Sequence, residues 1–309
     1  MRGARSFLLL ALVAAGIGGY VWFVEMKRDS SSEETPREKL FAVDTSQIHE
    51  VRLRNEAGET STLKKAGDRW TLAEVEGASV DDTELSNITS GLASLELQRV
   101  VDEQPASLAE YGLDTPRFTV AFTDAAGKSH TLLLGSKTPM GGDLYAKLPD
   151  APRVFLVGGF LEESFNRSRF DLRDKAILKF AREAVSGVEL SAGSSRISLV
   201  RRGGNWHMSA PSDEPADDTV VEGLIDRLAT ARMQSIVDDA GAAAAALAKP
   251  SAAVGITAGP TRAQLEIGGA AGEGTVYARD TVRNIVFTIE APLAAELAKK
   301  AEDFRKKAQ

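Results

Sequence analysis

Two pairs of adjacent aspartates are the residues of this chain that most suggest chemistry. Asp81 and Asp82 form the first pair, and Asp217 and Asp218 form the second. Two neighbouring carboxylates can act as a general acid and a general base. Each pair, however, stands just before apolar residues at helical spacing, where an aspartate accepts hydrogen bonds from the first free N–H groups of a helix. We therefore interpret Asp81 and Asp217 as helix N-caps.

Histidine, cysteine and phosphate-binding motifs provide no stronger candidate. His49, His130 and His207 each fall in a predicted strand, without a metal-like neighbour three or four residues away. The Gly-Lys-Ser run at 127–129 resembles the end of a phosphate-binding loop, but Phe122 stands where the first glycine is needed. The chain has no cysteine, which excludes disulfides, a thiol nucleophile and Cys-based metal sites. We therefore expect no cofactor, no metal and no enzymatic activity.

The chain is one pattern written twice, because landmark residues recur at an offset that drifts only from 136 to 132. A repeat of this length is a duplicated domain with its own core rather than a solenoid unit. We assign module one to residues 47–180 and module two to residues 181–309. The matched pairs are Trp70 with Trp206, Asp81 with Asp217, Leu134-Gly135 with Ile267-Gly268, Tyr145 with Tyr277, Phe155 with Phe287 and Arg173 with Arg305.

Within each module the hydrophobic periodicity changes in the same order. Hairpins are predicted over 60–72 and 196–208, with tryptophan beginning each return strand. Apolar residues at helical spacing follow, from Leu85 in module one and from Val221 in module two. Each tryptophan is expected to be half-buried against this helix.

A shorter helix and a run of strands should complete each module. The short helix is predicted over 106–111 and again over 242–248. Since strands and helices do not alternate as in a doubly wound fold, we expect an α+β fold: a tandem duplication of a mainly antiparallel sheet module with one main amphipathic helix each. The predicted strands include 48–54, 118–122, 132–134, 144–148 and 153–157 in module one, and 252–257, 264–267, 275–279 and 284–289 in module two.

The N-terminal segment predicts a single transmembrane helix before the modules. Residues 7–24 carry no charge and are long enough to cross a hydrocarbon core of roughly 30 Å. Arg2 and Arg5 precede the segment, and aromatic residues close it, as at a membrane interface. The alternative is a cleaved signal peptide, because residues 11–15 are small, but no A-x-A site with a polar mature start follows.

This anchor predicts a single-pass protein of the bacterial inner membrane. Residues 1–28 would form a short cytoplasmic stub and the membrane span, with the bulk of the chain in the periplasm. Residues 29–46 are largely polar and include Pro36, as expected of a tether. The bilayer is thus an expected partner through residues 7–24.

The charge balance argues against nucleic acid as a partner. The net charge is −7, and residues 29–309 contain 33 basic and 43 acidic side chains. A body of that sign binds polyanions poorly. Basic clusters over 167–175 and 299–307 are either solvated surfaces or docking surfaces.

Five segments of module one closely resemble the bacterial family known as domain of unknown function 4340. Module two departs from this pattern at Ala-Leu-Ala-Lys-Pro250 and at Asp-Phe-Arg-Lys-Lys307. The resemblance implies a single-helix envelope protein of a kind often encoded beside ABC-transporter components related to gliding-motility systems, and it carries over no catalytic residue. The segments are Leu108-Ala-Glu-Tyr-Gly-Leu-Asp-Thr-Pro116, Leu134-Gly-Ser-Lys-Thr-Pro139, Leu144-Tyr-Ala146, Val154-Phe-Leu-Val157 and Phe170-Asp-Leu-Arg-Asp-Lys175.

Two functions remain open from the sequence. The first is a non-catalytic, periplasm-facing accessory or scaffold protein of an ABC-transporter-type envelope complex, with integral membrane transporter subunits as partners. The alternative is an envelope hydrolase or carbohydrate-binding module, in which Tyr145 and Tyr277 would stack on sugars.

The segment that ends module one is the predicted partner-docking site or inter-module junction. Arg173 is expected to pair with a carboxylate there. The competing interpretation is an internal salt bridge of structural value only. The residues of this predicted site are Arg169, Asp171, Arg173, Asp174 and Lys175.

Overall fold

The computed structural model describes residue 20, residues 39–237 and residues 240–306. Apart from residue 20, the predicted anchor over 7–24 therefore lies outside the described residues, as does most of the predicted tether over 29–46. Within the described part of the chain, no helix combines the length and the apolar character that a membrane span requires.

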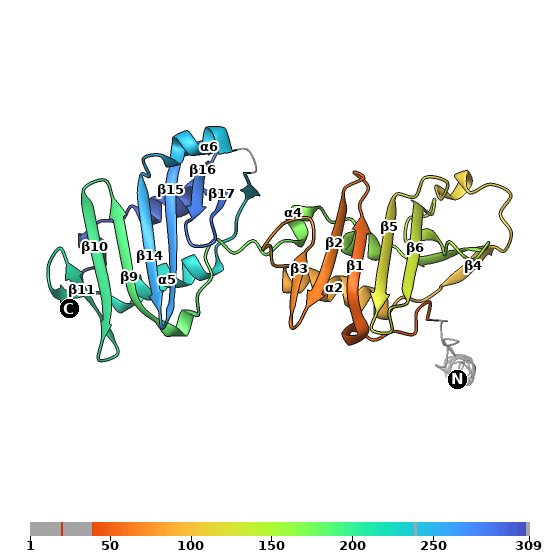
Figure 1. Ribbon diagram of the computed structural model, residues 1–309, viewed down its shortest axis with the longest axis horizontal. Helices are drawn as coiled ribbons and strands as arrows, with labels where there is room; N and C mark the ends of the chain where they lie inside the picture. The colour runs from red at the N-terminus through yellow and green to blue at the C-terminus, as the bar shows by residue number, and fades with distance from the viewer. Residues whose placement is uncertain (1–19, 21–38, 238–239, 307–309) are drawn as a thin grey trace, which may run out of the picture. The chain divides into compact units, whose positions relative to one another are not determined.

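Two large sheets dominate the fold (Figure 1). Sheet 1 has eight strands in the order β3-β2-β1-β5-β6-β7-β8-β4. Their bounds are β1 (Ile48–Arg54), β2 (Thr60–Ala66), β3 (Arg69–Leu72), β4 (Arg99–Asp102), β5 (Phe118–Asp124), β6 (Ser129–Lys137), β7 (Asp143–Lys147) and β8 (Val154–Gly158).

Sheet 2 has nine strands in the order β12-β11-β10-β9-β14-β15-β16-β17-β13. Their bounds are β9 (Val185–Ala192), β10 (Ser195–Arg202), β11 (Asn205–Ala210), β12 (Glu214–Pro215), β13 (Ser235–Ile236), β14 (Ala252–Ala258), β15 (Thr261–Gly272), β16 (Thr275–Asp280) and β17 (Ile285–Glu290).

The two sheets have the same topology. If β12 is set aside, each strand of sheet 2 corresponds to one strand of sheet 1 in the same order. In both sheets the strand at one edge, β4 or β13, follows the main helix in the sequence. The registers agree as well, because Phe118 pairs with Leu134 in sheet 1 as Ala252 pairs with Ile267 in sheet 2. The prediction of an α+β fold with tandem, antiparallel sheet modules is confirmed.

One amphipathic helix accompanies each sheet, as predicted. These helices are α2 (Asp82–Ala93) and α5 (Asp218–Thr230). Ile88 and Leu92 of α2 are buried. The shorter helices are α3 (Leu161–Phe165), α4 (Arg169–Leu172), α6 (Ala240–Leu247) and α7 (Ala291–Leu297), with 3-10 turns η1 (Thr45–Gln47), η2 (Ala109–Tyr111), η3 (Arg182–Ala184) and η4 (Ala301–Phe304).

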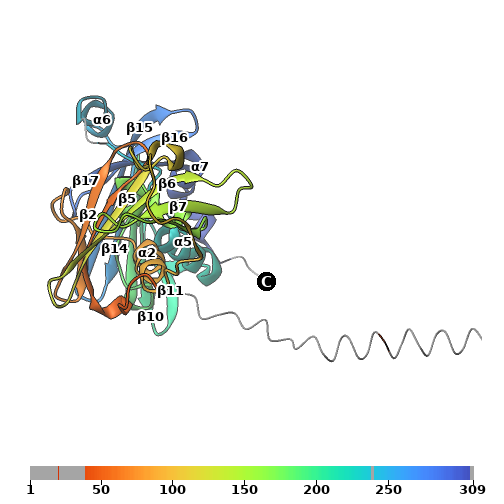
Figure 2. The same ribbon diagram turned by 90° about the vertical axis from the view of Figure 1, so that its right-hand side faces the viewer.

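The core of sheet 2 lies between α5 and one face of the strands. Leu224, Ile225 and Leu228 of α5 belong to one buried cluster with Val188, Val254 and other inward residues of the sheet. Because side chains alternate across a strand, the intervening residues face away from α5. Helix α6 lies on the other side of β14 and β15 from α5 (Figure 2).

The sheet edges are short. The edge strands β3 and β4 have four residues each, and β12 and β13 have two each. Short edge strands, and the proline at position 215 in β12, limit the pairing of these edges with other chains.

The short helix predicted over 106–111 is wrong. The structure has only the single turn η2, and Gly112 follows in the left-handed region with φ of 64°. The Ser107 hydroxyl accepts a hydrogen bond from the N–H of Ala109, which starts this turn locally. Glycine in this conformation commonly ends a helical turn, and here it follows the three residues of η2. The equivalent prediction in the second copy is confirmed by α6.

Contact density divides the chain into two compact units. One contains residues 1–58 and 87–166, and the other contains residues 59–86 and 167–309. The second unit thus includes β2, β3 and the start of α2 as well as all of sheet 2. The proposed module boundary at residue 180 stays a prediction.

Candidate functional site

The paired aspartates are used as helix caps. The Asp81 carboxylate accepts hydrogen bonds from the N–H groups of Thr83 and Glu84, at 3.0 and 3.3 Å. The Asp217 carboxylate accepts from Thr219 and Val220, at 3.0 and 3.3 Å. Both carboxylates satisfy free N–H groups of the first turn. The N-cap prediction is confirmed for both.

The second aspartate of module two connects α5 to the hairpin. The Asp218 carboxylate accepts a hydrogen bond of 2.7 Å from the N–H of Trp206, and the indole of Trp206 donates to Glu222 at 2.7 Å. Trp206 is 1% exposed, so the expectation of a half-buried position is wrong for this residue. Trp70 has the intermediate exposure that was expected.

The two matched tyrosines differ in their surroundings. Tyr145 packs edge-on against Tyr111, with ring centroids 5.1 Å apart. The Tyr111 hydroxyl donates to Asp102 at 3.1 Å. Partial desolvation and this hydrogen bond raise the pKa of Tyr111. Tyr277 lies on β16 opposite Thr288 of β17.

The segment that ends each module is built in the same way. In α4 the Asp171 carboxylate accepts from the N–H of Ser168 at 3.0 Å, and in η4 the Asp303 carboxylate accepts from the N–H of Lys300 at 2.8 Å. The carbonyl of the residue that follows each of these aspartates then accepts a hydrogen bond from the N-cap residue of the main helix. Leu172 accepts from the N–H of Asp81 at 2.9 Å, as Phe304 accepts from Asp217 at 2.8 Å.

Arg173 and Arg305 occupy equivalent backbone positions in these segments. Arg173 forms a β-bridge with Val80, and Arg305 forms one with Ala216. Burial works against the charged form of Asp171, but hydrogen bonds from Ser168 hold the pKa of that carboxyl below its ordinary value. The pairing of the Arg173 guanidinium with a carboxylate stays a prediction.

The remaining predicted site residues contact other residues of the second unit. The Arg169 guanidinium donates to the carbonyl of Thr60 at 3.1 Å. Lys175 lies 3.9 Å from Asp171. Asp174 pairs with Lys179 at 2.7 Å. Burial opposes ionisation of Asp174, but Lys179 and a backbone N–H lower its pKa.

Residues 174–177 link two parts of the second unit through their backbone. The N–H of Asp174 donates to Ser79 at 2.9 Å, and the carbonyl of Lys175 accepts from Met233 at 2.7 Å. The Arg283 guanidinium donates to the carbonyls of Ala176 and Ile177, both at 2.8 Å.

Sequence reasoning missed the two cations that support this linkage. Arg283 is held by Asp280, whose side chain is only 2% exposed, at 2.6 Å. Arg232 reaches Asp81 at 2.6 Å, across 151 positions of the sequence. The turn from 280 to 284 was a local signal for the first pair, whereas nothing in the spacing identifies the second.

A cavity of about 500 Å³ lies beside Arg173. Arg173, Arg283 and Glu76 supply its charged groups. Its other lining residues are mostly aliphatic: Val75, Ile236, Val237, Ile285 and Val286, together with Gly77 and Asn284.

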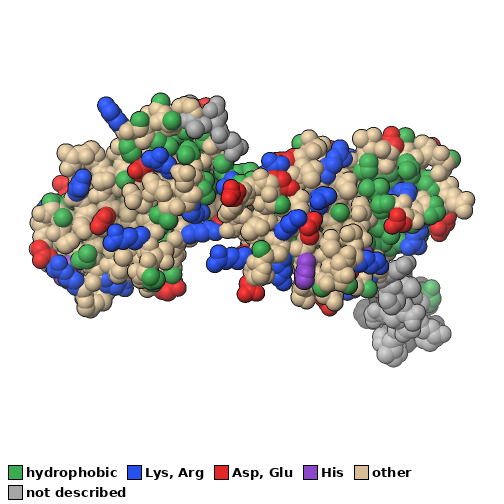
Figure 3. Space-filling model, viewed as in Figure 1, with side chains coloured by type: hydrophobic (Ala, Val, Ile, Leu, Met, Phe, Trp, Pro, Cys, Tyr) green, Lys and Arg blue, Asp and Glu red, His purple; other side chains and the backbone are tan. Residues whose placement is uncertain are grey.

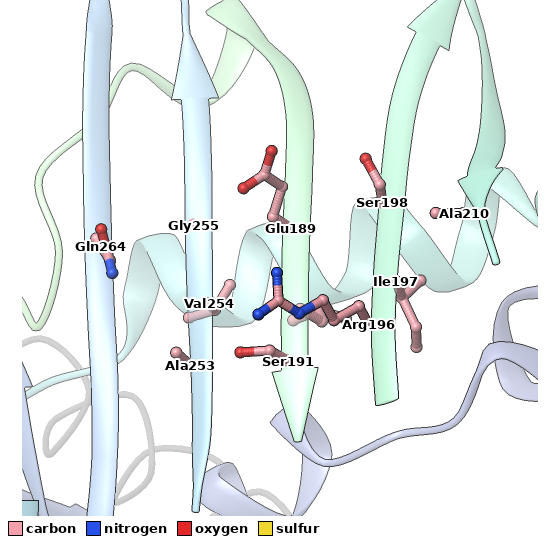
Figure 4. Close-up of a pocket in the computed structure, with 11 residues that line it drawn as sticks. Glu189, Ser191, Arg196, Ile197, Ser198, Ala210, Ala253, Val254, Gly255 and Gln264 are labelled. Atoms are coloured by element: carbon pink, nitrogen blue, oxygen red, sulfur yellow. The ribbon is translucent and has the colours of Figure 1, made fainter. Parts of the chain in front are cut away.

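A second cavity, of about 410 Å³, lies on the face of sheet 2 that points away from α5 (Figure 4). Its floor contains Ala253 and Gly255 of β14. Figure 4 shows the Arg196 side chain reaching from β10 across β9, with its guanidinium between Glu189 and Ser191.

The surface charges are mixed in sign. On the face shown in Figure 3, Lys and Arg side chains are interspersed with Asp and Glu side chains. Among the described residues, no three His, Asp or Glu side chains are grouped so that they could hold a metal ion.

Comparison with known proteins assigns the chain to a family. The model of the family described as Domain of unknown function (DUF4340) matches residues 70–250 and again residues 206–309. The matches begin at Trp70 and Trp206, the paired tryptophans of the two copies. The fold defines the class of the protein: a duplicated α+β protein with two antiparallel sheets. The chain belongs to the DUF4340 family. No curated protein and no solved structure matches it.

Proposed function

We propose that the protein is a membrane-anchored, periplasm-facing, non-catalytic scaffold of an ABC-transporter-type envelope complex. The uncharged segment over 7–24 and the polar residues that follow it support anchoring through a tether. The net negative charge of the remaining chain favours a protein partner over nucleic acid or an anionic lipid surface.

The observation that carries the proposal is the structural use of the repeated acidic residues. Asp81 and Asp217 cap the main helices, and Asp171 and Asp303 close the ends of the modules. A carboxylate that accepts hydrogen bonds from a helix end is held in place by the backbone. This use favours a scaffold over a hydrolase, in which such pairs would have to face a substrate.

The cavity beside Arg173 is the proposed docking surface. It combines two guanidinium groups with a largely aliphatic wall. Such a surface suits a segment of a transporter subunit that carries apolar side chains and a carboxylate, because Arg binds carboxylates in a fixed geometry and aliphatic burial adds affinity. The proposed docking role belongs to Arg173, which lines this cavity and lies in the segment that ends module one.

Affinity purification of the full-length protein from its own membranes tests the scaffold role. Wild type should retain transporter subunits after a carbonate wash. Arg173→Ala should release most of them, by about tenfold or more if a charged hydrogen bond is lost. Glu76→Arg should strengthen retention, because it adds positive charge at the exposed rim of the same cavity. Arg262→Ala, at an exposed site in β15, is the matched control.

The outcomes separate docking from stability. If Arg173→Ala retains its partner but lowers the thermal midpoint, Arg173 is a structural residue and the cavity is not the docking surface. If wild-type membranes never yield a transporter subunit, the scaffold role itself is wrong.

A further inference from the structure

We propose that the cavity on the open face of sheet 2 binds a zwitterionic dipeptide with small side chains. The proposal concerns a ligand site distinct from the scaffold role, and it stands or falls independently of that role. Its evidence is the shape of the sheet face, a difference between the two copies, and two oppositely charged side chains without a partner among the described residues.

The floor of the cavity is made by a glycine that the fold does not require. Gly255 lies in the middle of β14, and its φ is outside the positive range that favours glycine. A Cβ built there would meet only the Glu189 side chain, at 3.7 and 3.8 Å, which is ordinary contact. Glycine weakens a strand interior and often marks a place where another molecule approaches the backbone. The empty space above Gly255 is therefore the feature to be explained.

The first copy has different side chains at the corresponding place. Arg52 pairs with Ala121 across β1 and β5, in the register that Glu189 has with Gly255 across β9 and β14. Two residues after Arg52 on β1 lies Arg54, whose guanidinium donates to the carbonyl of Pro116 at 3.3 Å. The second copy has Ser191 at this position. Beside the cavity, the second copy therefore has a short side chain where the first copy has a long one.

Two opposite charges border the emptied space. In the part of the chain that the structure describes, neither the Glu189 carboxylate nor the Arg196 guanidinium has a hydrogen bond or an ion pair with another residue. Both side chains are exposed. The ligand that complements them carries an ammonium group for Glu189 and a carboxylate for Arg196.

The sheet register sets the spacing of the backbone positions that carry these charges. Arg196 pairs with Ser191, which is two residues from Glu189 along β9. Two residues of a strand span about 6.6 Å, and the ends of an extended dipeptide are separated by a similar length. Ser191 and Ser198 hydroxyls and the Gln264 amide, all lining the cavity, can bond the peptide group of such a ligand.

The floor also limits the ligand side chains. Ala253 and Gly255 leave room for methyl groups, within a total of about 410 Å³. The lining residues, which all belong to the described part of the chain, include no aromatic side chain. Stacking of a sugar ring, the usual basis of carbohydrate recognition by a flat surface, therefore has no support at this place.

Isothermal titration calorimetry of the full-length protein in detergent with Ala-Ala tests the proposal. Wild type should give saturable binding below about 10 mM ligand. N-acetyl-Ala-Ala lacks the ammonium group and Ala-Ala-amide lacks the carboxylate, so each should bind about tenfold more weakly. Glu189→Gln should weaken Ala-Ala but not N-acetyl-Ala-Ala, and Arg196→Gln should weaken Ala-Ala but not Ala-Ala-amide.

Filling the floor provides the independent test. Gly255→Val adds a strand-favouring side chain and should abolish binding while the protein stays folded. Thr257→Val, on the same face of β14 but outside the cavity, is the matched control and should bind as wild type. Wild type without saturable binding, or a folded Gly255→Val protein with unchanged affinity, would overturn the proposal. Sedimentation that shows a dimer dissociated by Gly255→Val would identify a second copy as the occupant instead, which also overturns it.

Discussion

Trp70 and Trp206 are the second residues of the matching strands β3 and β11, yet only one of them is a core residue. Both accept a hydrogen bond at the backbone carbonyl from the residue just before an N-cap, Val80 in one copy and Ala216 in the other. Trp206 is fully buried and bonded to Glu222 of α5, whereas Trp70 has intermediate exposure. The duplication thus kept the backbone pattern while the side-chain packing of the two copies diverged.

The largest expected effect follows from this difference. Trp206→Ala should destabilise the protein by about 3 to 5 kcal/mol, because a buried aromatic and its cavity are lost. Trp70→Ala should cost less, about 1 to 2 kcal/mol, because part of its surface is already in water. Urea denaturation followed by circular dichroism measures both. Equal losses in the two variants would show that burial is not what separates the copies.

A second comparison concerns the matched glycines at Gly135 and Gly268. A Cβ at Gly135 would lie 2.2 Å from the carbonyl oxygen of Tyr111, and a Cβ at Gly268 would lie 2.8 Å from that of Ala246. Each glycine therefore lets a covering turn or helix approach its sheet closely.

Alanine at these glycines should destabilise both copies, and the first copy more. Gly135→Ala should cost about 1 to 3 kcal/mol, as overpacking does, and Gly268→Ala should fall near the lower end of that range. Gly127→Ala, at a turn where nothing lies within 4 Å of the added Cβ but φ is 79°, separates backbone strain from the steric clash. If Gly268→Ala proved the more damaging of the two, the close approach would not explain the repeated glycine.

The predictions from sequence succeeded where the signal was local. The caps Asp81 and Asp217 act on N–H groups two and three residues away, and the apolar stripe of α5 lies on one helix. The hairpins were visible for the same reason, whereas the repeat was visible because the same residue types recur in the same order. The helix expected at 106–111 was wrong because Gly112 and Ser107 favour a single turn, which helical propensity alone does not reveal.

What the sequence did not reveal depends on residues that are distant along the chain. Arg283 reaches Ala176 across 107 positions, and its role follows only from the folded backbone. The burial of Trp206 depends on α5 carrying Glu222 at the facing position. The cavity over Gly255 could be found only once five neighbouring strands were placed in register, because each of its residues alone is an ordinary strand or surface residue.

The two N-caps offer a finer comparison. Asp81→Ala should cost about 1.5 kcal/mol and Asp217→Ala about 1 kcal/mol, because both lose a cap but only Asp81 also pairs with Arg232. Asp81→Asn keeps a cap and removes the charge. It should therefore cost only the difference between the costs of the two alanine variants. That difference should shrink in 1 M salt, because the Debye length is then only about 3 Å. A difference unchanged by salt would mean that Arg232 contributes through packing.

The smallest expected effect is a pH dependence that belongs to the first copy. Asp174 has a pKa below its ordinary value of 3.8, and its counterpart in the second copy is Lys306. Because the folded-state pKa is lowered, the unfolded chain takes up the proton at higher pH than the folded chain does. The stabilisation is therefore fully present well above pH 3.8 and is lost as the pH falls through that value and below it. Asp174→Asn should lower the thermal midpoint at neutral pH and flatten its decline between about pH 5 and pH 3. Lys306→Asn should leave that decline as in wild type, and an equal flattening in both variants would remove the assignment to Asp174.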